Sequence, residues 1–238
     1  MKRVATSLFR WTLGYLVYIV AGIILLLVTF LPLEQLRYRA ASLMCRATLW
    51  ALGFKLRVVG IYPDDQPHIF MANHASFLDI FIIGAIMKGK FTGVVAEEVL
   101  KHPFLRMILN RFRAIPIRRR DREAAIAAIT MAEDRLQRGY QVGILPEGTR
   151  TLNGKLGPLK KGGFHMALNT SAPILPIGII GAFRGKPKNT WHLRPGEITV
   201  HIGQPIPPGQ YHQMTMDQAM EAVRRQLLVL TGEEDLPA

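Results

Sequence analysis

The sequence contains little cysteine and little acidic charge, and each shortage excludes a class of protein. Its single cysteine, Cys45, rules out an internal disulfide and a thiolate cluster for a metal ion, so the chain suits a reducing compartment. We expect this cysteine to be a small apolar residue on a helix. Asp and Glu number 17 against 30 Lys and Arg, which gives a formal net charge of +13. This charge favours an anionic membrane surface or anionic substrates.

Features of nucleic-acid-binding proteins and of serine hydrolases are also missing. No basic helix, zinc-binding spacing or aromatic-studded strand accompanies the positive charge, so we expect no nucleic-acid partner. The chain has no G-x-S-x-G segment, which forms the nucleophile elbow of many hydrolases. A covalent acyl-enzyme is therefore not expected. We also predict no metal ion and no other cofactor, because no cluster of ligand residues calls for one.

Hydrophobic residues, in contrast, make up 49% of the chain and form one long run near its start. Residues 11–33 carry no charged side chain. As a helix this run would be about 34 Å long, enough to cross a hydrocarbon core of ~30 Å. Basic residues flank the run on both sides, so the positive-inside rule gives no orientation. Residues 34–52 form a basic amphipathic pattern, and Pro32 marks a bend before them.

Residues 1–52 are therefore predicted to be membrane-anchoring helices. Two arrangements fit, namely one spanning helix followed by an interfacial helix, or a hairpin that enters one leaflet. In residues 53–238, short apolar runs alternate with helical patterns. This alternation predicts a single α/β domain, a sheet covered by helices on both faces. We expect the sheet to be mixed. Thr215 and Gln218 form a capping-box pattern that opens the last amphipathic helix.

The first chemistry-bearing motif is a histidine and an aspartate five residues apart, His74 and Asp79. An apolar strand precedes the histidine, and an apolar helix begins near the aspartate. In the first helical turn the carboxylate can reach back to one ring nitrogen and leave the other to accept a proton from a hydroxyl. Ser76 lies between them, and we interpret it as a helix cap rather than as a nucleophile.

Spacing alone does not identify such a pair, because His212 and Asp217 have the same spacing. That second pair follows a proline-rich stretch and leads into the capping box at Thr215. We interpret it as an ordinary polar helix start.

The second motif is the loop Pro146-Glu147-Gly148-Thr149-Arg150, which directly follows an apolar strand. Loops at the carboxyl ends of strands carry the ligand-binding groups of α/β sheets. Arg150 can bind a phosphate through two parallel hydrogen bonds. Glu147 can receive a substrate hydroxyl or hold Arg150. A plain salt bridge within the loop is the alternative.

A basic segment supplies further candidates for an anion site. Residues 101–120 include seven Lys or Arg and no acidic residue, and the segment ends in Arg118-Arg119-Arg120 after a strand-like IPI. Lys160 and Lys161 add a smaller cluster. Most of these charges are expected on a solvated or membrane-facing surface, and one or two at a strand end could bind phosphate.

Together these motifs resemble those of the glycerolipid acyltransferases, and most closely of the bacterial 1-acylglycerol-3-phosphate acyltransferases. NHASFLD, IPIRR, LPEGTR and APILPI occur in that order between Asn73 and Ile177. The resemblance implies that His74 is the general base and Asp79 its partner. It also implies that the glycerol phosphate is bound by Arg119 or, one residue earlier, by Arg118. The other residues implied to bind it are Glu147, Gly148, Thr149 and Arg150. Pro116 and Arg118 depart from the family pattern, which has a bulky aromatic and often an acid there.

The implied reaction transfers a fatty acyl chain from acyl-CoA or acyl carrier protein to the sn-2 hydroxyl of lysophosphatidate, giving phosphatidate. The implied location is the inner, cytoplasmic membrane, with the active site at the cytoplasmic leaflet. Three alternatives stay open, namely another lysophospholipid or an amino-acid lipid as acceptor, a membrane thioesterase or lysolipid hydrolase, and a non-catalytic lipid-binding scaffold.

Overall fold

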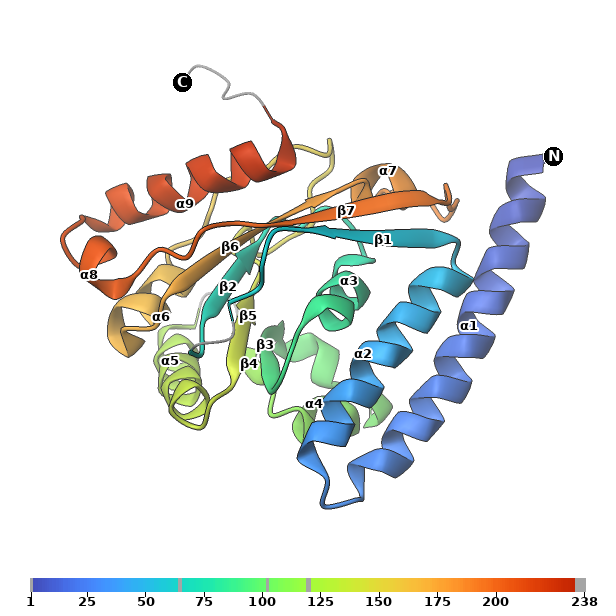
Figure 1. Cartoon of the computed structure of the whole chain (residues 1–238), viewed down its shortest axis with the longest axis horizontal. Helices are drawn as coiled ribbons and strands as arrows, with labels where there is room; N and C mark the ends of the chain where they lie inside the picture. The colour runs from blue at the N-terminus through green and yellow to red at the C-terminus, as the bar shows by residue number, and fades with distance from the viewer. Residues whose placement is uncertain (1, 64–65, 102, 119–120, 234–238) are drawn as a thin grey trace.

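The computed structural model describes residues 2–63, 66–101, 103–118 and 121–233, and Figure 1 shows their arrangement around one twisted sheet. The strands are β1 (Phe54–Val59), β2 (Ile69–Ala72), β3 (Phe91–Ala96), β4 (Ile115–Ile117), β5 (Gln141–Ile144), β6 (Ile174–Ile180) and β7 (Gly196–Ile202). The helices are α1 (Lys2–Thr29), α2 (Glu34–Ala51), α3 (Asp79–Ile86), η1 (Glu97–Lys101), α4 (Pro103–Arg111), α5 (Arg122–Gln137), α6 (Gly162–Thr170), α7 (Ala182–Gly185), α8 (Pro208–Tyr211) and α9 (Met216–Thr231).

The sheet is mixed, as predicted, although the alternation of strands and helices alone favours a parallel sheet. Its strand order is β1-β7-β6-β2-β5-β3-β4. The pairing of β6 with β7 is antiparallel, and the other pairings are parallel. The parallel neighbours β6, β2 and β5 therefore end at the same edge of the sheet, and the segments after them meet there.

The alternation of side chains along β2 shows how both faces of the sheet are buried. Phe70 and Ala72 belong to one core cluster, which includes side chains of α2 and α3. Ile69 and Met71 belong to the other, which includes side chains of α5, α6 and α9. Because successive side chains point to opposite faces, β2 is apolar throughout and has helices on both sides. Figure 1 shows α9 on one side and α2 with α3 on the other.

The two N-terminal helices form an antiparallel hairpin that packs against the rest of the chain (Figure 1). The bend predicted at Pro32 falls between the end of α1 and the start of α2. α2 lies against α3, where the Ser42 hydroxyl donates to the Ala85 carbonyl at 3.1 Å. A Cβ at Gly84 would come within 2.6 Å of the Cys45 sulfur, so the glycine permits this close approach. Burial raises the pKa of the Cys45 thiol to about 12, which agrees with an inert apolar role.

α1 is the one helix of the described residues that is long and apolar enough to cross a membrane. Packing nevertheless occupies one side along its length, because Ser7, Leu25 and Thr29 are at most 1% exposed. The Trp11 indole also donates to the Trp191 carbonyl at 2.7 Å. The outer side of α1 is apolar and exposed, with Leu8, Phe9, Tyr15, Leu16, Ile19, Val20, Ile23, Ile24 and Leu27. This arrangement places an apolar stripe on the surface of the protein.

Candidate active site

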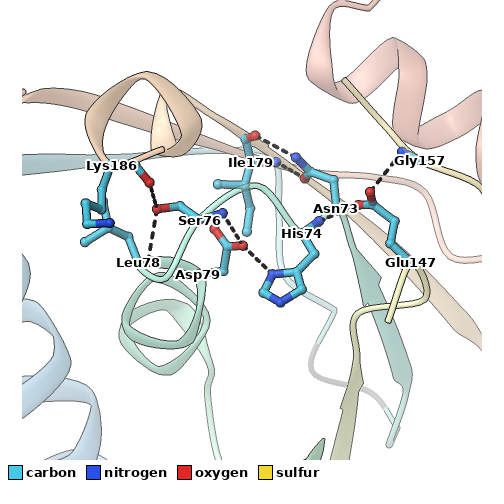
Figure 2. A network of polar contacts seen from close by, with 9 residues as sticks. All are labelled: Asn73, His74, Ser76, Leu78, Asp79, Glu147, Gly157, Ile179 and Lys186. Atoms are coloured by element: carbon cyan, nitrogen blue, oxygen red, sulfur yellow. Dashed lines mark hydrogen bonds and ion pairs between the residues drawn. The ribbon is translucent and has the colours of Figure 1, made fainter. Parts of the chain in front are cut away.

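His74 lies in the turn between β2 and α3, two residues after the strand ends. Its Nδ1 atom is 2.7 Å from Oδ2 of Asp79, the first residue of α3. The same carboxylate oxygen accepts a hydrogen bond from the Ser76 amide at 2.9 Å. The turn therefore folds the carboxylate back onto the ring, which is the contact that the five-residue spacing predicts (Figure 2).

The surroundings of this pair differ sharply between its two members. Asp79 is fully buried, whereas the His74 side chain is 22% exposed. Burial raises the pKa of the Asp79 carboxyl, and the hydrogen bonds from His74 and Ser76 oppose that rise. With Nδ1–H donating to the carboxylate, the Nε2 atom carries the lone pair. Nε2 lies on the side of the ring away from Asp79 (Figure 2), where it can accept a proton.

Glu147 connects the β5 loop to the backbone of the catalytic histidine candidate. Its Oε1 accepts from the His74 amide at 2.6 Å, and its Oε2 accepts from the Gly157 amide at 2.9 Å. The Thr151 amide donates in turn to the His74 carbonyl at 2.9 Å. Glu147 is only 4% exposed, and burial raises the pKa of its carboxyl. The Glu147 carboxylate thus holds the backbone of His74 and Gly157 in place, which the sequence does not predict. Its contact with substrate stays a prediction.

Cationic side chains gather beside this loop. Gly148 has a φ of +66°, and a Cβ there would come within 2.9 Å of the Lys160 ammonium. The Lys188 ammonium lies 3.5 Å from the Thr149 hydroxyl. Lys186 is only 8% exposed. Desolvation lowers the pKa of its ammonium, and the positive charge of Arg150 adds to the effect. Lys186 and Lys188 carry no sequence signal that would have predicted this position.

The basic segment after β4 lies farther from the histidine. β4 is three places from β2 in the sheet order, which corresponds to roughly 14 Å at ~4.8 Å per strand. The Arg118 guanidinium is held by Glu97 at 2.7 Å and by Asp121 at 3.2 Å, and these carboxylates raise its pKa. Arg119 lies outside the described residues. Phosphate binding by either arginine stays a prediction.

Two neighbours of His74 in the sequence have structural tasks. The Asn73 side chain joins β2 to β6, since it donates to the Ile179 carbonyl at 3.0 Å and accepts from the Ile179 amide at 2.7 Å. The Ser76 hydroxyl is fully buried and donates to the Lys186 carbonyl at 2.7 Å. It also accepts from the Leu78 amide at 3.2 Å. Ser76 therefore braces the turn from inside. Its interpretation as a helix cap is wrong, because α3 begins after Leu78 and has no side-chain cap.

The second histidine and aspartate do not meet. The His212 Nε2 atom lies 3.2 Å from the Ser171 hydroxyl, and Asp217 pairs with Lys161 at 3.4 Å. The capping box of Thr215 and Gln218 is present at the start of α9. The interpretation of this pair as a polar helix start is confirmed.

Comparison with known proteins identifies the class of protein to which this site belongs. The acyltransferase family model matches residues 55–180, which contain β2, α3, the β5 loop and all of β6. The chain belongs to this acyltransferase family, and the predicted enzyme class is confirmed.

The chain is similar to several proteins named 1-acyl-sn-glycerol-3-phosphate acyltransferase. The one from Cocos nucifera is 30% identical over 205 residues, covering 84% of this chain and 66% of that protein. The one from Borreliella burgdorferi is 33% identical over 145 residues, covering 58% of each chain. The chain thus spans about two thirds of the length of its plant relative.

A solved structure shows the same fold. The crystal structure of the 1-acyl-sn-glycerophosphate (LPA) acyltransferase PlsC from Thermotoga maritima superposes with a TM-score of 0.80 at 22% identity. The match covers 95% of this chain and 93% of that one. It confirms the predicted mixed sheet flanked by helices.

Proposed function

We propose that this acyltransferase moves a fatty acyl chain from an acyl thioester to the sn-2 hydroxyl of 1-acylglycerol-3-phosphate, giving phosphatidate. The observation that carries the proposal is the 2.7 Å contact between His74 and the fully buried Asp79, which leaves Nε2 of the ring as a base. The names of the relatives support this acceptor.

In this reaction His74 acts first as a base and then as an acid. Its Nε2 atom takes the hydroxyl proton while the substrate oxygen attacks the thioester carbonyl carbon. Asp79 holds the ring through Nδ1 and stabilises the imidazolium that forms. When the C–S bond breaks, the proton passes from Nε2 to the thiolate sulfur. General-base assistance of this kind is worth ~10²–10⁴ in rate.

The cationic group beside the β5 loop supplies the site for the acceptor's phosphate. Arg150 lies on the loop that the Thr151 amide ties to His74. Lys160 and Lys188 contact the same loop, at Gly148 and Thr149. A phosphate monoester needs several positive charges within a short distance of the reacting hydroxyl, and this group provides them.

The same geometry supports attachment to one face of a membrane. α1 uses one side to pack against the catalytic domain and exposes the other as an apolar stripe. At the start of α1, Ser7 accepts a hydrogen bond from the Leu193 amide. Near its end, Leu25 shares a core cluster with Phe112 and Tyr140. Because α1 is fixed to the α/β domain at both ends, it cannot cross the bilayer away from that domain, and a hairpin that lies in one leaflet is favoured. We place this leaflet on the cytoplasmic side of the inner membrane, where acyl-CoA and acyl carrier protein are available as donors.

Transfer of labelled acyl chains to lysophosphatidate in detergent micelles tests the proposal. Acyl-CoA and acyl carrier protein are supplied separately, and wild type is compared with His74→Ala and the matched control His212→Ala. Phosphatidate formed by wild type and the control but lost in His74→Ala would support the proposed reaction and base. Equal product from all three proteins would refute the base, and free fatty acid without phosphatidate would indicate a hydrolase.

A further inference from the structure

A second basic site lies at the start of α1, on a surface that the catalytic mechanism does not use. A cavity of about 480 Å³ is lined by Arg3, Thr6, Arg184, Leu193, Arg194 and Pro195. Residues of three segments line it, namely the first turns of α1, the helix α7 and the loop before β7. The volume falls within the ~300–1,000 Å³ that is usual for small-ligand sites.

Hydrogen bonds fix these segments to one another. The Ser7 hydroxyl is fully buried and accepts from the Leu193 amide at 3.1 Å, which joins α1 to the loop. The Arg194 amide donates to the Gly185 carbonyl at 2.9 Å, which joins the loop to α7. The backbone therefore brings the three arginines to one cavity, where their exposed side chains can reach a common ligand.

The charge of the cavity is uncompensated. None of its lining residues is acidic. Within residues 2–63, 66–101, 103–118 and 121–233, no carboxylate forms an ion pair with Arg3, Arg184 or Arg194. Arg118, in comparison, is held by two acids. Three guanidinium groups around one cavity form a site for a phosphate ester, which can accept their paired hydrogen bonds.

The exposed face of α1 indicates the source of that phosphate. Val4, Leu8 and Phe9 follow Arg3 within the first two turns of the helix, on other sides than the cavity, and they are 42%, 57% and 62% exposed. With this apolar face in the lipid, the cationic cavity at the same end of the helix would lie near the headgroups, which suits a molecule with a phosphate head and an acyl tail. We propose that this cavity binds the headgroup of an anionic membrane phospholipid, separately from the acceptor at His74. The inference rests on the proposed membrane attachment.

Vesicle binding tests attachment and headgroup recognition separately. Wild type is sedimented with vesicles of phosphatidylcholine alone and with vesicles that contain one quarter phosphatidylglycerol. The test variant is Arg184→Gln/Arg194→Gln. The control is Arg57→Gln/Arg225→Gln, which removes the same charge from exposed positions outside the cavity. For wild type, we expect vesicles with phosphatidylglycerol to bind on the order of tenfold more tightly than neutral vesicles. The test variant should bind both vesicle types with the affinity that wild type has for neutral ones. The control should bind each vesicle type as wild type does.

Three results would overturn the proposal. Equal losses in both variants would mean that only net charge matters, and equal wild-type binding to the two vesicle types would mean that no headgroup is recognised. The third result would come from equilibrium dialysis of the protein with dihexanoyl phosphatidylglycerol and with CoA. If wild type binds only CoA, and Arg184→Gln/Arg194→Gln does not bind it, the cavity is a site for a soluble phosphate ester. Failure of wild type to bind either vesicle type would refute the membrane attachment itself. Acyl transfer in micelles should be the same for both variants.

Discussion

Two histidine–aspartate pairs have the same sequence spacing in this molecule, but the side chains of only one pair are in contact. His74 and Asp79 are 2.7 Å apart, and the aspartate is fully buried. His212 and Asp217 bind other partners, and the side chain of Asp217 is 84% exposed. The spacing is therefore insufficient. A strand ends before the first pair, a helix starts at its aspartate, and contacts from distant segments enclose the turn.

The largest expected difference between the pairs is the effect of each aspartate on the rate of acyl transfer. Asp79→Asn keeps the shape of the side chain but removes the charge that selects the Nδ1–H tautomer of His74. We expect acyl transfer to fall by about 10³–10⁴, as for comparable orienting carboxylates. Asp217→Asn should leave the rate unchanged. Initial rates at saturating lysophosphatidate measure both. A loss of less than tenfold in Asp79→Asn would mean that this carboxylate does not orient the base.

The next largest effect is expected from Glu147, whose carboxylate braces the backbone of the first pair. The second pair has no such brace in the part of the chain that the structure describes. Glu147→Gln keeps one acceptor oxygen, so one of the two backbone amides, of His74 or of Gly157, loses its partner. We expect a rate about 10–100-fold lower, by analogy with residues that orient the ligands of metal sites. Glu221→Gln, at an exposed position of α9, is the control.

A KM-against-kcat comparison separates bracing from substrate binding by Glu147. Misplacement of His74 lowers kcat, whereas loss of a contact formed equally in ground and transition states raises KM. An unchanged kcat with a raised KM in Glu147→Gln would contradict the bracing role.

The pH dependence of stability tests the effect of burying the Asp79 carboxyl. Burial raises the pKa of this carboxyl above its ordinary value of 3.8. As pH rises through that value, the unfolded chain therefore loses this proton before the folded protein does. The unfolded state then binds fewer protons, so the contribution of Asp79 to the free energy of unfolding falls with increasing pH. Asp79→Asn removes this contribution.

We therefore expect Asp79→Asn to gain stability relative to wild type as pH increases from about 4 towards the raised pKa. Denaturant melts at several pH values measure the difference. The opposite trend would show that the hydrogen bonds from His74 and Ser76 outweigh burial.

The sequence predicts the elements of this fold well because their signals are local. Periodicity and turn residues identify β2, α3 and β5, and the spacing of His74 and Asp79 lets the carboxylate reach the ring. The contacts that complete the site are not local. Glu147 binds the His74 amide across 73 residues, and Ser76 binds the Lys186 carbonyl across 110. Such contacts depend on the strand order, which no local pattern contains.

The smallest expected effects lie around the second pair, and they concern stability alone. Thr215 caps α9, since its hydroxyl accepts from the Gln218 amide at 3.2 Å. Thr215→Ala should lower the free energy of unfolding by about 1 kcal/mol, the usual value of such a cap. His212→Ala loses only an exposed contact with Ser171, so we expect a change within about 0.5 kcal/mol. Urea melts distinguish the two. A larger loss in His212→Ala than in Thr215→Ala would mean that the second pair has a structural role beyond the helix start.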